Sequence, residues 1–172
     1  LNQTLERARL DLTRSELAAA LGREDAAWRL AHDAHLAFAP DSVDTAAASE
    51  ILARGDLGAG RADAALARAT EALAIAETFD LAPLRARALH TRGLTKRAQG
   101  EDALPDLRQA FSAAARDLGL TPSALSKLVG RLEDRLGVRL LHRTTRRLQL
   151  TAEGETFLNR ARPILTALDE AE

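Results

Sequence analysis

The sequence contains no cysteine, methionine or tyrosine, and aromatic residues make up only 3% of its 172 residues. Without cysteine the chain can form neither disulfides nor thiolate metal sites, which fits a reducing cytoplasm. No apolar run reaches the roughly 18 residues that cross a membrane, and no stretch resembles a signal peptide. Alanine, leucine and arginine dominate instead, and this composition favours packed helices over a large sheet. We therefore expect a mainly α protein that resides in the cytoplasm and has no membrane partner.

The sequence also offers little that an enzyme would need. It contains no evident phosphate-binding Gly-Lys-Ser loop, nucleophile elbow or pair of catalytic carboxylates. His32, His35 and His90 are the candidates for a metal site, because the first two lie one helical turn apart. Zinc needs three or four converging ligands, and no cysteine or His-x3-His pair is present to complete such a set. We expect no catalytic site, no metal and no cofactor.

Charge is distributed unevenly, although the formal net charge is only -1. Residues 1–110 carry a net charge of -3, residues 111–150 carry 8 Arg and Lys against 3 Asp and Glu, and residues 151–172 return to -3. A basic block between two acidic segments is what a nucleic-acid site on a near-neutral protein would produce. By charge alone, a solvated basic surface is an equal alternative.

The first 110 residues contain an internal repeat. Two series of alanines step through it by 38 residues: Ala27, Ala65 and Ala103, then Ala34, Ala72 and Ala110. Within a unit the two alanines are seven residues apart, so they share a helix face that a neighbouring helix can approach closely. Breakers at Pro40 and Pro83 separate the units. Each unit begins with a further helix, predicted at residues 5–21, 45–57 and 84–99.

This pattern predicts three helix pairs over residues 1–108, and the pairs resemble tetratricopeptide repeats. The resemblance implies a concave surface that binds a peptide or a partner helix, although an inert spacer fits the sequence equally well. Trp28 stands where the other two units have Leu66 and Leu104, and we expect it in the core at the end of the stack.

Residues 109–172 predict a second domain, built around two helices joined by a tight turn. A short helix is expected over residues 112–118, and a second over residues 121–136 with Thr121 as N-cap and Gly137 as its stop. The apolar spacing from 103 to 118 also allows the last repeat helix to run straight into this motif. The second helix has apolar residues at helical spacing on its inner face: Leu125, Leu128, Val129, Leu132 and Leu136.

The outer face of the second helix carries short hydroxyls and cations, which suit close approach to a DNA groove: Ser123, Ser126, Lys127 and Arg131. An arginine-rich hairpin follows, with strands predicted at residues 139–143 and 148–151. We expect Leu140, Leu148 and Leu150 to anchor it. Arginine near the tip of such a wing can follow phosphates or enter the minor groove.

Five stretches then occur in order at a characteristic spacing: AARDL, TPSALSK, RLEDRLGVRLL, RTTRR and LTAEG. Together they make residues 111–172 closely similar to the N-terminal DNA-binding domain of LysR-type transcriptional regulators. The resemblance implies a winged helix-turn-helix in which helix 121–136 reads the major groove and wing 139–151 contacts the backbone or the minor groove. It also implies the contact residues: Thr121, Ser123, Ser126, Lys127, Arg131, Arg143, Arg146 and Arg147.

Two features depart from the family pattern. A complete helix and a turn precede the motif in that family, whereas here only residues 106–109 resemble the start of that helix. The last repeat helix is therefore the candidate to take its place. The family's effector domain would follow residue 172, so we expect no small-molecule site of that kind here. The chain also begins at Leu1 rather than at methionine, as a fragment of a longer product would.

The last predicted helix follows Thr151 and carries an apolar seam with 4-3-4-3 spacing that Pro163 interrupts: Phe157, Ala161, Ile164, Leu168 and Ala171. In the resembled family this helix pairs two subunits, which implies a homodimer on a pseudo-palindromic site. A seam that folds back onto its own domain is the alternative. The sequence thus predicts a transcriptional regulator that binds double-stranded DNA. Its alternative is a protein-interaction scaffold whose winged domain is silent.

Overall fold

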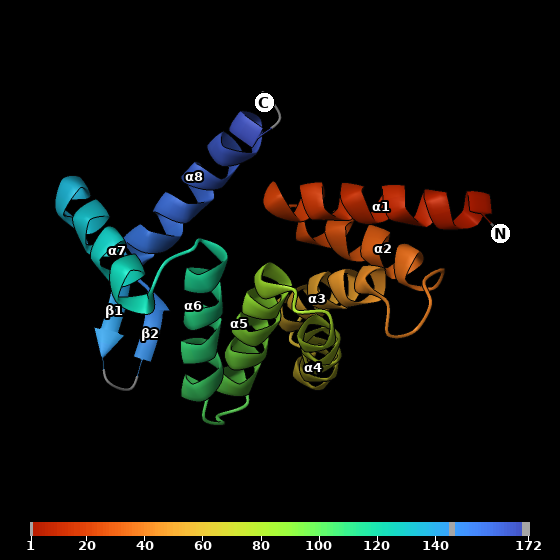
Figure 1. Cartoon of the computed structure of the whole chain (residues 1–172), viewed down its shortest axis with the longest axis horizontal. Helices are drawn as coiled ribbons and strands as arrows, with labels where there is room; N and C mark the ends of the chain where they lie inside the picture. Colours follow the sequence, from red (N-terminus) through yellow and green to blue (C-terminus); the bar gives the residue numbers. More distant parts are fainter. Residues whose placement is uncertain (1, 145–146, 170–172) are drawn as a thin grey trace. The chain divides into compact units, whose positions relative to one another are not determined.

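The computed structural model describes residues 2–144 and 147–169, with side chains over residues 3–142 and 150–161. The protein is mainly α, which confirms the predicted fold class, and the elements follow one another as shown in Figure 1: α1 (Asn2–Ala20), α2 (Glu24–His35), α3 (Val43–Gly58), α4 (Ala62–Thr78), α5 (Ala82–Ala98), α6 (Leu104–Asp117), α7 (Pro122–Leu136), β1 (Leu141–Thr144), β2 (Arg147–Leu150) and α8 (Ala152–Asp169). No helix in the described ranges is long and apolar enough to cross a membrane. The chain divides into two compact units, Leu1–Ala114 and Ala115–Glu172.

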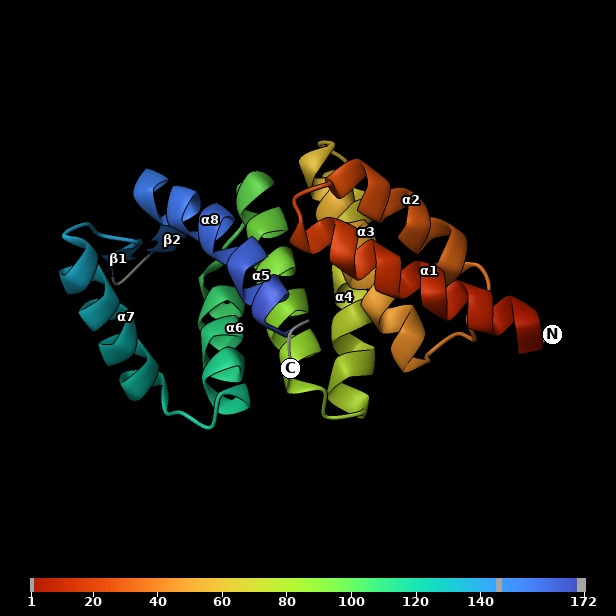
Figure 2. The same cartoon turned by 90° about the horizontal axis from the view of Figure 1, so that it is seen from above.

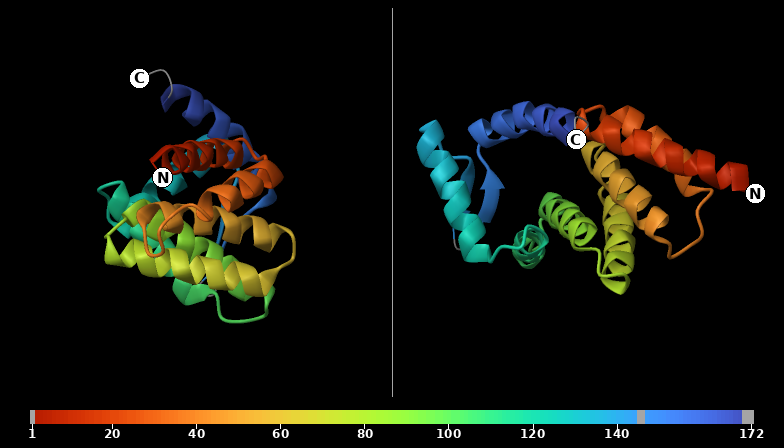
Figure 3. Two further views of the ribbon diagram at one scale, coloured as in Figure 1. Left: turned by 90° about the vertical axis from the view of Figure 1, so that its right-hand side faces the viewer. Right: turned by 45° about the horizontal axis from the view of Figure 1, so that its top comes forward.

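The first unit is a stack of helices in which each of α1 to α4 contacts the next helix along the chain (Figure 2). The helix α3 also contacts α1 and α5, so the first helices of successive pairs are neighbours (Figure 3). The bounds of α1, α3 and α5 lie within three residues of the predicted ones. Pro83 differs from its prediction, because it lies in the first turn of α5 rather than in the link before it.

Glycine ends the first helix of each pair in the same way. Gly22, Gly60 and Gly100 all have φ between 72° and 79°, in the left-handed region that favours glycine. In each turn the residue after the glycine donates its N–H to the carbonyl five residues before it at 2.8 Å, as Arg23 does to Ala18. This hydrogen bond satisfies a helix-terminal carbonyl and reverses the chain.

Small residues allow the helices to pack closely. All six alanines of the two repeated series are buried, which confirms the predicted packing face. Gly55 serves the same purpose, since a Cβ atom there would lie 2.6 Å from Cδ1 of Trp28. Trp28 packs against the core that the first helices of the stack form, as predicted, but it is not fully buried. The indole is partly buried between α2 and α3, at the junction of the first and second pairs, because Gly55 leaves space for it there.

The helix α6 completes the third pair. Its Leu107 and Ala110 are buried, and Ala110 joins a core with residues of α4 and α5. A Cβ atom on Gly93 of α5 would lie 2.9 Å from the Leu107 side chain, so the two helices touch at this point. A separate helix over residues 112–118 does not form. The helix α6 runs unbroken from Leu104 to Asp117, as the apolar spacing across the junction allowed.

The second unit contains α7, a two-stranded antiparallel sheet and α8. The strands pair from Leu141 with Leu150 to Thr144 with Arg147. They are displaced from the predicted 139–143 and 148–151, because residues 139 and 140 hydrogen-bond to neighbouring elements instead of pairing in the ladder. Of the three leucines expected to anchor the hairpin, Leu140 is buried and Leu150 is exposed, while the Leu148 side chain lies outside the described residues.

Candidate nucleic-acid interface

The helix α7 begins as predicted. Thr121 has an extended backbone, and its hydroxyl accepts the N–H of Ala124 at 3.1 Å. Pro122 occupies the first helical position, where the missing N–H costs nothing. Thr121 is exposed, so the N-terminus of α7, with its partial positive charge, faces solvent and can approach a phosphate. Gly137 ends the helix with φ 68°.

One face of α7 carries the predicted contact residues. Ser123, Lys127 and Arg131 are spaced four apart, so they share a face, and all three are exposed. Ser126 lies beside them, is half-buried and takes part in another interaction within the chain. Together with Thr121, these residues place two cations and three hydroxyls along one side of an exposed helix.

The opposite face of α7 differs from its prediction. Leu128 is 46% exposed and Leu136 is 41% exposed, whereas Leu125, Val129 and Leu132 are half-buried. The buried residue of this helix is instead Glu133, which the apolar pattern did not include. Its position is one turn beyond Val129, so it falls on the inward-facing side of the helix.

Glu133 binds the start of the wing with both carboxylate oxygens. Its Oε1 accepts the N–H groups of Leu140 at 2.9 Å and Leu141 at 3.0 Å. Its Oε2 accepts Nη1 of Arg139 at 3.1 Å. A buried carboxylate is tolerated only when hydrogen bonds replace its lost hydration, and these contacts provide them.

The first turn of α8 holds the same segment from its other side. The Thr151 hydroxyl donates to the carbonyl of Arg139 at 2.5 Å and accepts the N–H of Gly154 at 2.9 Å, which caps α8. The Thr151 N–H donates to the carbonyl of Leu140 at 2.9 Å. A Cβ atom on Gly154 would lie only 2.1 Å from that carbonyl oxygen, so residue 154 has to be glycine for this approach.

The wing arginines are located by their backbone alone. Arg143 pairs with Leu148 and Arg147 with Thr144 across the antiparallel ladder. Their side chains lie outside the described residues, as does Arg146 entirely. The structure thus brings Arg143 and Arg147 to the tip of the hairpin, and their contacts with DNA stay a prediction.

The predicted dimerisation residues lie on α8. Phe157 and Ala161 are half-buried, and the side chains of Ile164 and Leu168 lie outside the described residues. Phe157 lines an apolar hollow together with Leu136 and Val138 of its own unit. The first residue of the seam, Phe157, therefore faces this hollow. This is compatible both with a seam that pairs two subunits and with one that folds back onto its own domain.

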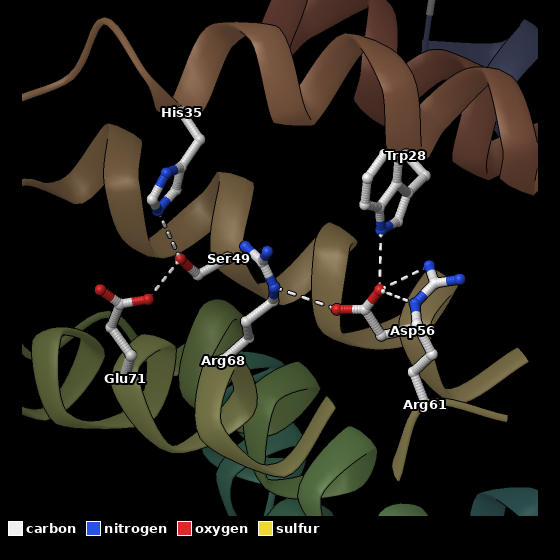
Figure 4. Close-up of polar contacts among 7 residues, drawn as sticks. All are labelled: Trp28, His35, Ser49, Asp56, Arg61, Arg68 and Glu71. Carbon is white, nitrogen blue, oxygen red and sulfur yellow. Dashed lines mark hydrogen bonds and ion pairs between the residues drawn. The ribbon is translucent and has the colours of Figure 1, made fainter. Parts of the chain in front are cut away.

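Two polar clusters lie in the first unit (Figure 4). In the first, Oδ1 of the buried Asp56 accepts Nε1 of Trp28 at 3.0 Å and Nη2 of Arg61 at 2.7 Å, while Oδ2 lies 3.0 Å from Nε of Arg68. Arg61 also lies over the Trp28 ring at 5.5 Å. These contacts join α2, α3 and α4, so their role is to hold two helix pairs together.

The second cluster contains a histidine, a serine and a glutamate, as some nucleophilic active sites do, but its hydrogen bonds run in another order. The Ser49 hydroxyl donates to Oε2 of Glu71 at 2.7 Å, and Nε2 of His35 lies 3.1 Å from the same hydroxyl (Figure 4). Because the single hydroxyl proton points to Glu71, His35 donates to Ser49 and cannot act as its base. Burial lowers the pKa of His35, against the raising effect of Glu71, so the ring is neutral near pH 7. Among the described residues, no three His, Asp or Glu side chains gather as a metal site.

Comparison with known proteins identifies the second part of the chain. Residues 107–155 match the family model described as "Bacterial regulatory helix-turn-helix protein, lysR family". These residues form a LysR-type helix-turn-helix domain. The match begins at Leu107, so the first part of the LysR-type domain belongs to α6 and contributes Leu107 and Ala110 to the core of the first unit.

Relatives in curated collections agree with this identification. The HTH-type transcriptional regulator CrgA of Neisseria meningitidis is 51% identical over 63 residues, which are 37% of this chain and 21% of that protein. A probable hydrogen peroxide-inducible genes activator of Mycobacterium xenopi is 48% identical over 62 residues, 36% of this chain and 33% of that protein. The chain thus spans a third or less of the length of these two relatives.

A solved structure resembles a larger part of the chain. Aspartyl phosphate phosphatase F from Bacillus subtilis matches with a TM-score of 0.56 over 76% of this chain and 33% of that one. The two are 20% identical, so the likeness concerns the fold alone.

Proposed function

We propose that this chain is part of a cytoplasmic transcriptional regulator that binds double-stranded DNA. One observation carries the proposal: the LysR-type match at 107–155 coincides with a helix, α7, whose exposed face presents hydroxyls and cations. In this proposal α7 reads the major groove and the wing contacts the backbone or the minor groove. The contact residues are Thr121, Ser123, Ser126, Lys127, Arg131, Arg143, Arg146 and Arg147.

The charge of the chain supports this proposal. Residues 111–150 carry 8 Arg and Lys against 3 Asp and Glu, in a chain whose net charge is -1. Cations that neutralise phosphates release counterions, so affinity falls steeply as salt rises. We expect a strong salt dependence for the whole chain even though its net charge is slightly negative.

The seam of α8 supports a dimeric form of this regulator. Phe157, Ala161, Ile164 and Leu168 repeat at the spacing of a coiled-coil seam, and a two-fold dimer would present two α7 helices to a pseudo-palindromic site. Analytical ultracentrifugation of the whole chain tests this part. A monomer at tens of micromolar protein would contradict the dimer and leave the DNA-binding proposal standing.

A double substitution tests DNA binding. We expect Lys127→Ala with Arg131→Ala to weaken binding of a labelled mixed-sequence duplex at least tenfold at about 50 mM salt. The slope of log K against log salt should also become shallower by roughly 1.8, because two phosphate contacts are lost at about 0.9 each. Fluorescence anisotropy at several salt concentrations measures both quantities.

The matched control removes the same charge elsewhere. Arg23→Ala with Arg29→Ala takes two exposed arginines from the first unit and leaves α7 intact. The control should keep the slope of the unaltered chain. If both variants lost the same affinity for the duplex, the change in net charge alone would explain the effect. An unchanged slope in the α7 variant would refute the contact assignment.

We propose a second role for the first unit, as a surface for a protein partner. The helix pairs with glycine turns and buried alanines support a stack of the tetratricopeptide type, and such stacks bind a peptide or a helix on the face of their first helices. If the whole chain retained a partner protein but bound no duplex at low salt, the chain would be an interaction scaffold and not a regulator.

A further inference from the structure

The start of the wing is held between two helices of the second unit. On one side lies Glu133 near the end of α7, and on the other lies Thr151 at the start of α8. On the side of the wing, the backbone groups that make these hydrogen bonds belong to residues 139–141, which lead into β1 and include its first residue. We call this segment, with Glu133, Thr151 and Gly154, the wing clamp.

The clamp depends on one carboxylate. The side chain of Glu133 is 1% exposed, and its Oε1 accepts two successive backbone N–H groups, those of Leu140 and Leu141. Leu141 is the first residue of β1, so the second of these bonds holds the first strand of the wing directly. The carboxylate also belongs to the last turn of α7, which ends at Leu136. It therefore connects the recognition helix with the wing through a single side chain.

We propose that Glu133 is a positioning residue for DNA binding, which fixes the direction of the wing relative to α7 so that both can address one duplex. This inference rests on the proposed function, because it assigns a task within the DNA-binding surface. Glu133 itself touches no DNA, since it is buried. It acts through Leu140 and Leu141, whose backbone N–H groups its Oε1 accepts.

The chemistry of the clamp predicts which substitutions preserve it. In Glu133→Gln the amide oxygen can still accept both backbone N–H groups, and the exposed Arg139 can turn to water. In Glu133→Asp the charge remains, but the carboxylate is withdrawn by about 1.5 Å, the length of one C–C bond. In Glu133→Ala both charge and acceptor are lost. We therefore expect the unaltered chain and Glu133→Gln to bind DNA more tightly than Glu133→Asp and Glu133→Ala.

Asp134 provides the matched control. It is the next residue on α7, carries the same charge and is exposed. Removing a negative charge near DNA should leave binding unchanged or strengthen it slightly. Asp134→Ala thus separates an electrostatic effect from the geometric one, because only the Glu133 variants disturb the clamp.

The experiment measures the whole chain with a labelled mixed-sequence duplex at several salt concentrations, at a temperature where circular dichroism shows every variant folded. We expect Glu133→Ala and Glu133→Asp to bind roughly tenfold more weakly, with a slope of log K against log salt shallower by about 0.9 or more, as wing phosphate contacts are lost. Glu133→Gln and Asp134→Ala should keep the original slope. If Glu133→Ala does not fold, Glu133→Asp carries the test.

A second measurement is independent of DNA. Amide hydrogen exchange at Leu140 and Leu141 should become faster in the Asp and Ala variants and stay slow in the Gln variant. Unchanged exchange, or an unchanged salt slope in folded Glu133→Asp, would overturn the inference. Absence of duplex binding by the unaltered chain would instead refute the proposed function, so the two failures are distinguishable.

Discussion

Replacing Asp106 with alanine removes the carboxylate that ties α6 to α5. Its Oδ2 accepts Nε of Arg92 at 2.8 Å and lies 3.0 Å from Nζ of Lys96, while Oδ1 accepts Nη2 of Arg92 at 2.7 Å. The Asp106 side chain is 5% exposed, against 20% for Arg92 and 27% for Lys96. The substitution therefore leaves two cations that are only partly hydrated, next to a small cavity.

The expected loss can be estimated from these contacts. Breaking a fully buried ion pair costs about 3–5 kcal/mol. Because both cations here can turn partly into water, we expect about 2–3 kcal/mol. For a unit of this size that corresponds to a fall in Tm of roughly 8–12 °C. The single tryptophan, Trp28, lies in the same unit, so its fluorescence reports the unfolding of this unit specifically.

The pH dependence provides a second check. Burial raises the pKa of Asp106, but hydrogen bonds from Arg92 and Lys96 outweigh burial and hold it below the ordinary 3.8. Its stabilising effect is therefore present above about pH 3.8 and is lost as the pH falls through the lowered value. Urea unfolding at pH 7 and pH 3 should show the difference between unaltered chain and Asp106→Ala shrinking at the lower pH. A loss below about 0.5 kcal/mol at pH 7, no larger than that of the exposed control Glu101→Ala, would refute this reasoning.

Two further predictions concern single residues. Gly154→Ala should destabilise the second unit by about 1–3 kcal/mol or more, because its Cβ atom would lie 2.1 Å from the Leu140 carbonyl oxygen. Gly130→Ala, whose Cβ atom would meet nothing within 4 Å, should be neutral or stabilising, and thermal circular dichroism compares the two. Burial lowers the pKa of His35, so its contribution to stability is full above pH 6.5 and is lost as the pH falls below that value. The stability of His35→Gln should vary less between pH 7.5 and pH 5 in urea unfolding, and an equal pH dependence would contradict the assignment.

Local signals in the sequence were sufficient to predict where most helices begin and end and which face they bury. The glycines at 22, 60 and 100 end helices through their own backbone freedom, and the Thr121 hydroxyl caps α7 by accepting the N–H of Ala124, three residues further on. The alanines seven residues apart marked the buried face of each second helix. Each of these features depends on residues within about two helical turns, which is why a pattern in one chain was enough to locate them.

The extent of α6 could not be decided in this way. The apolar spacing around Ala110 suits both an unbroken helix and a break before residue 112. The structure has one helix, and Leu107 and Ala110 pack in the third pair while Asp106 binds cations of α5. These contacts join α6 to residues 10 or more positions away in the chain, and no local propensity encodes them.

The sequence by itself determined the repeat, the helix α7 and the LysR-type motif, because helix periodicity, caps and motif spacing are properties of neighbouring residues. Only the tertiary structure decided that Leu128 is exposed while Glu133 is buried, and that residue 154 must be glycine. A carboxylate is buried when backbone N–H groups are brought within its reach. Here those groups come from Leu140 and Leu141, after a turn has folded the wing back onto α7.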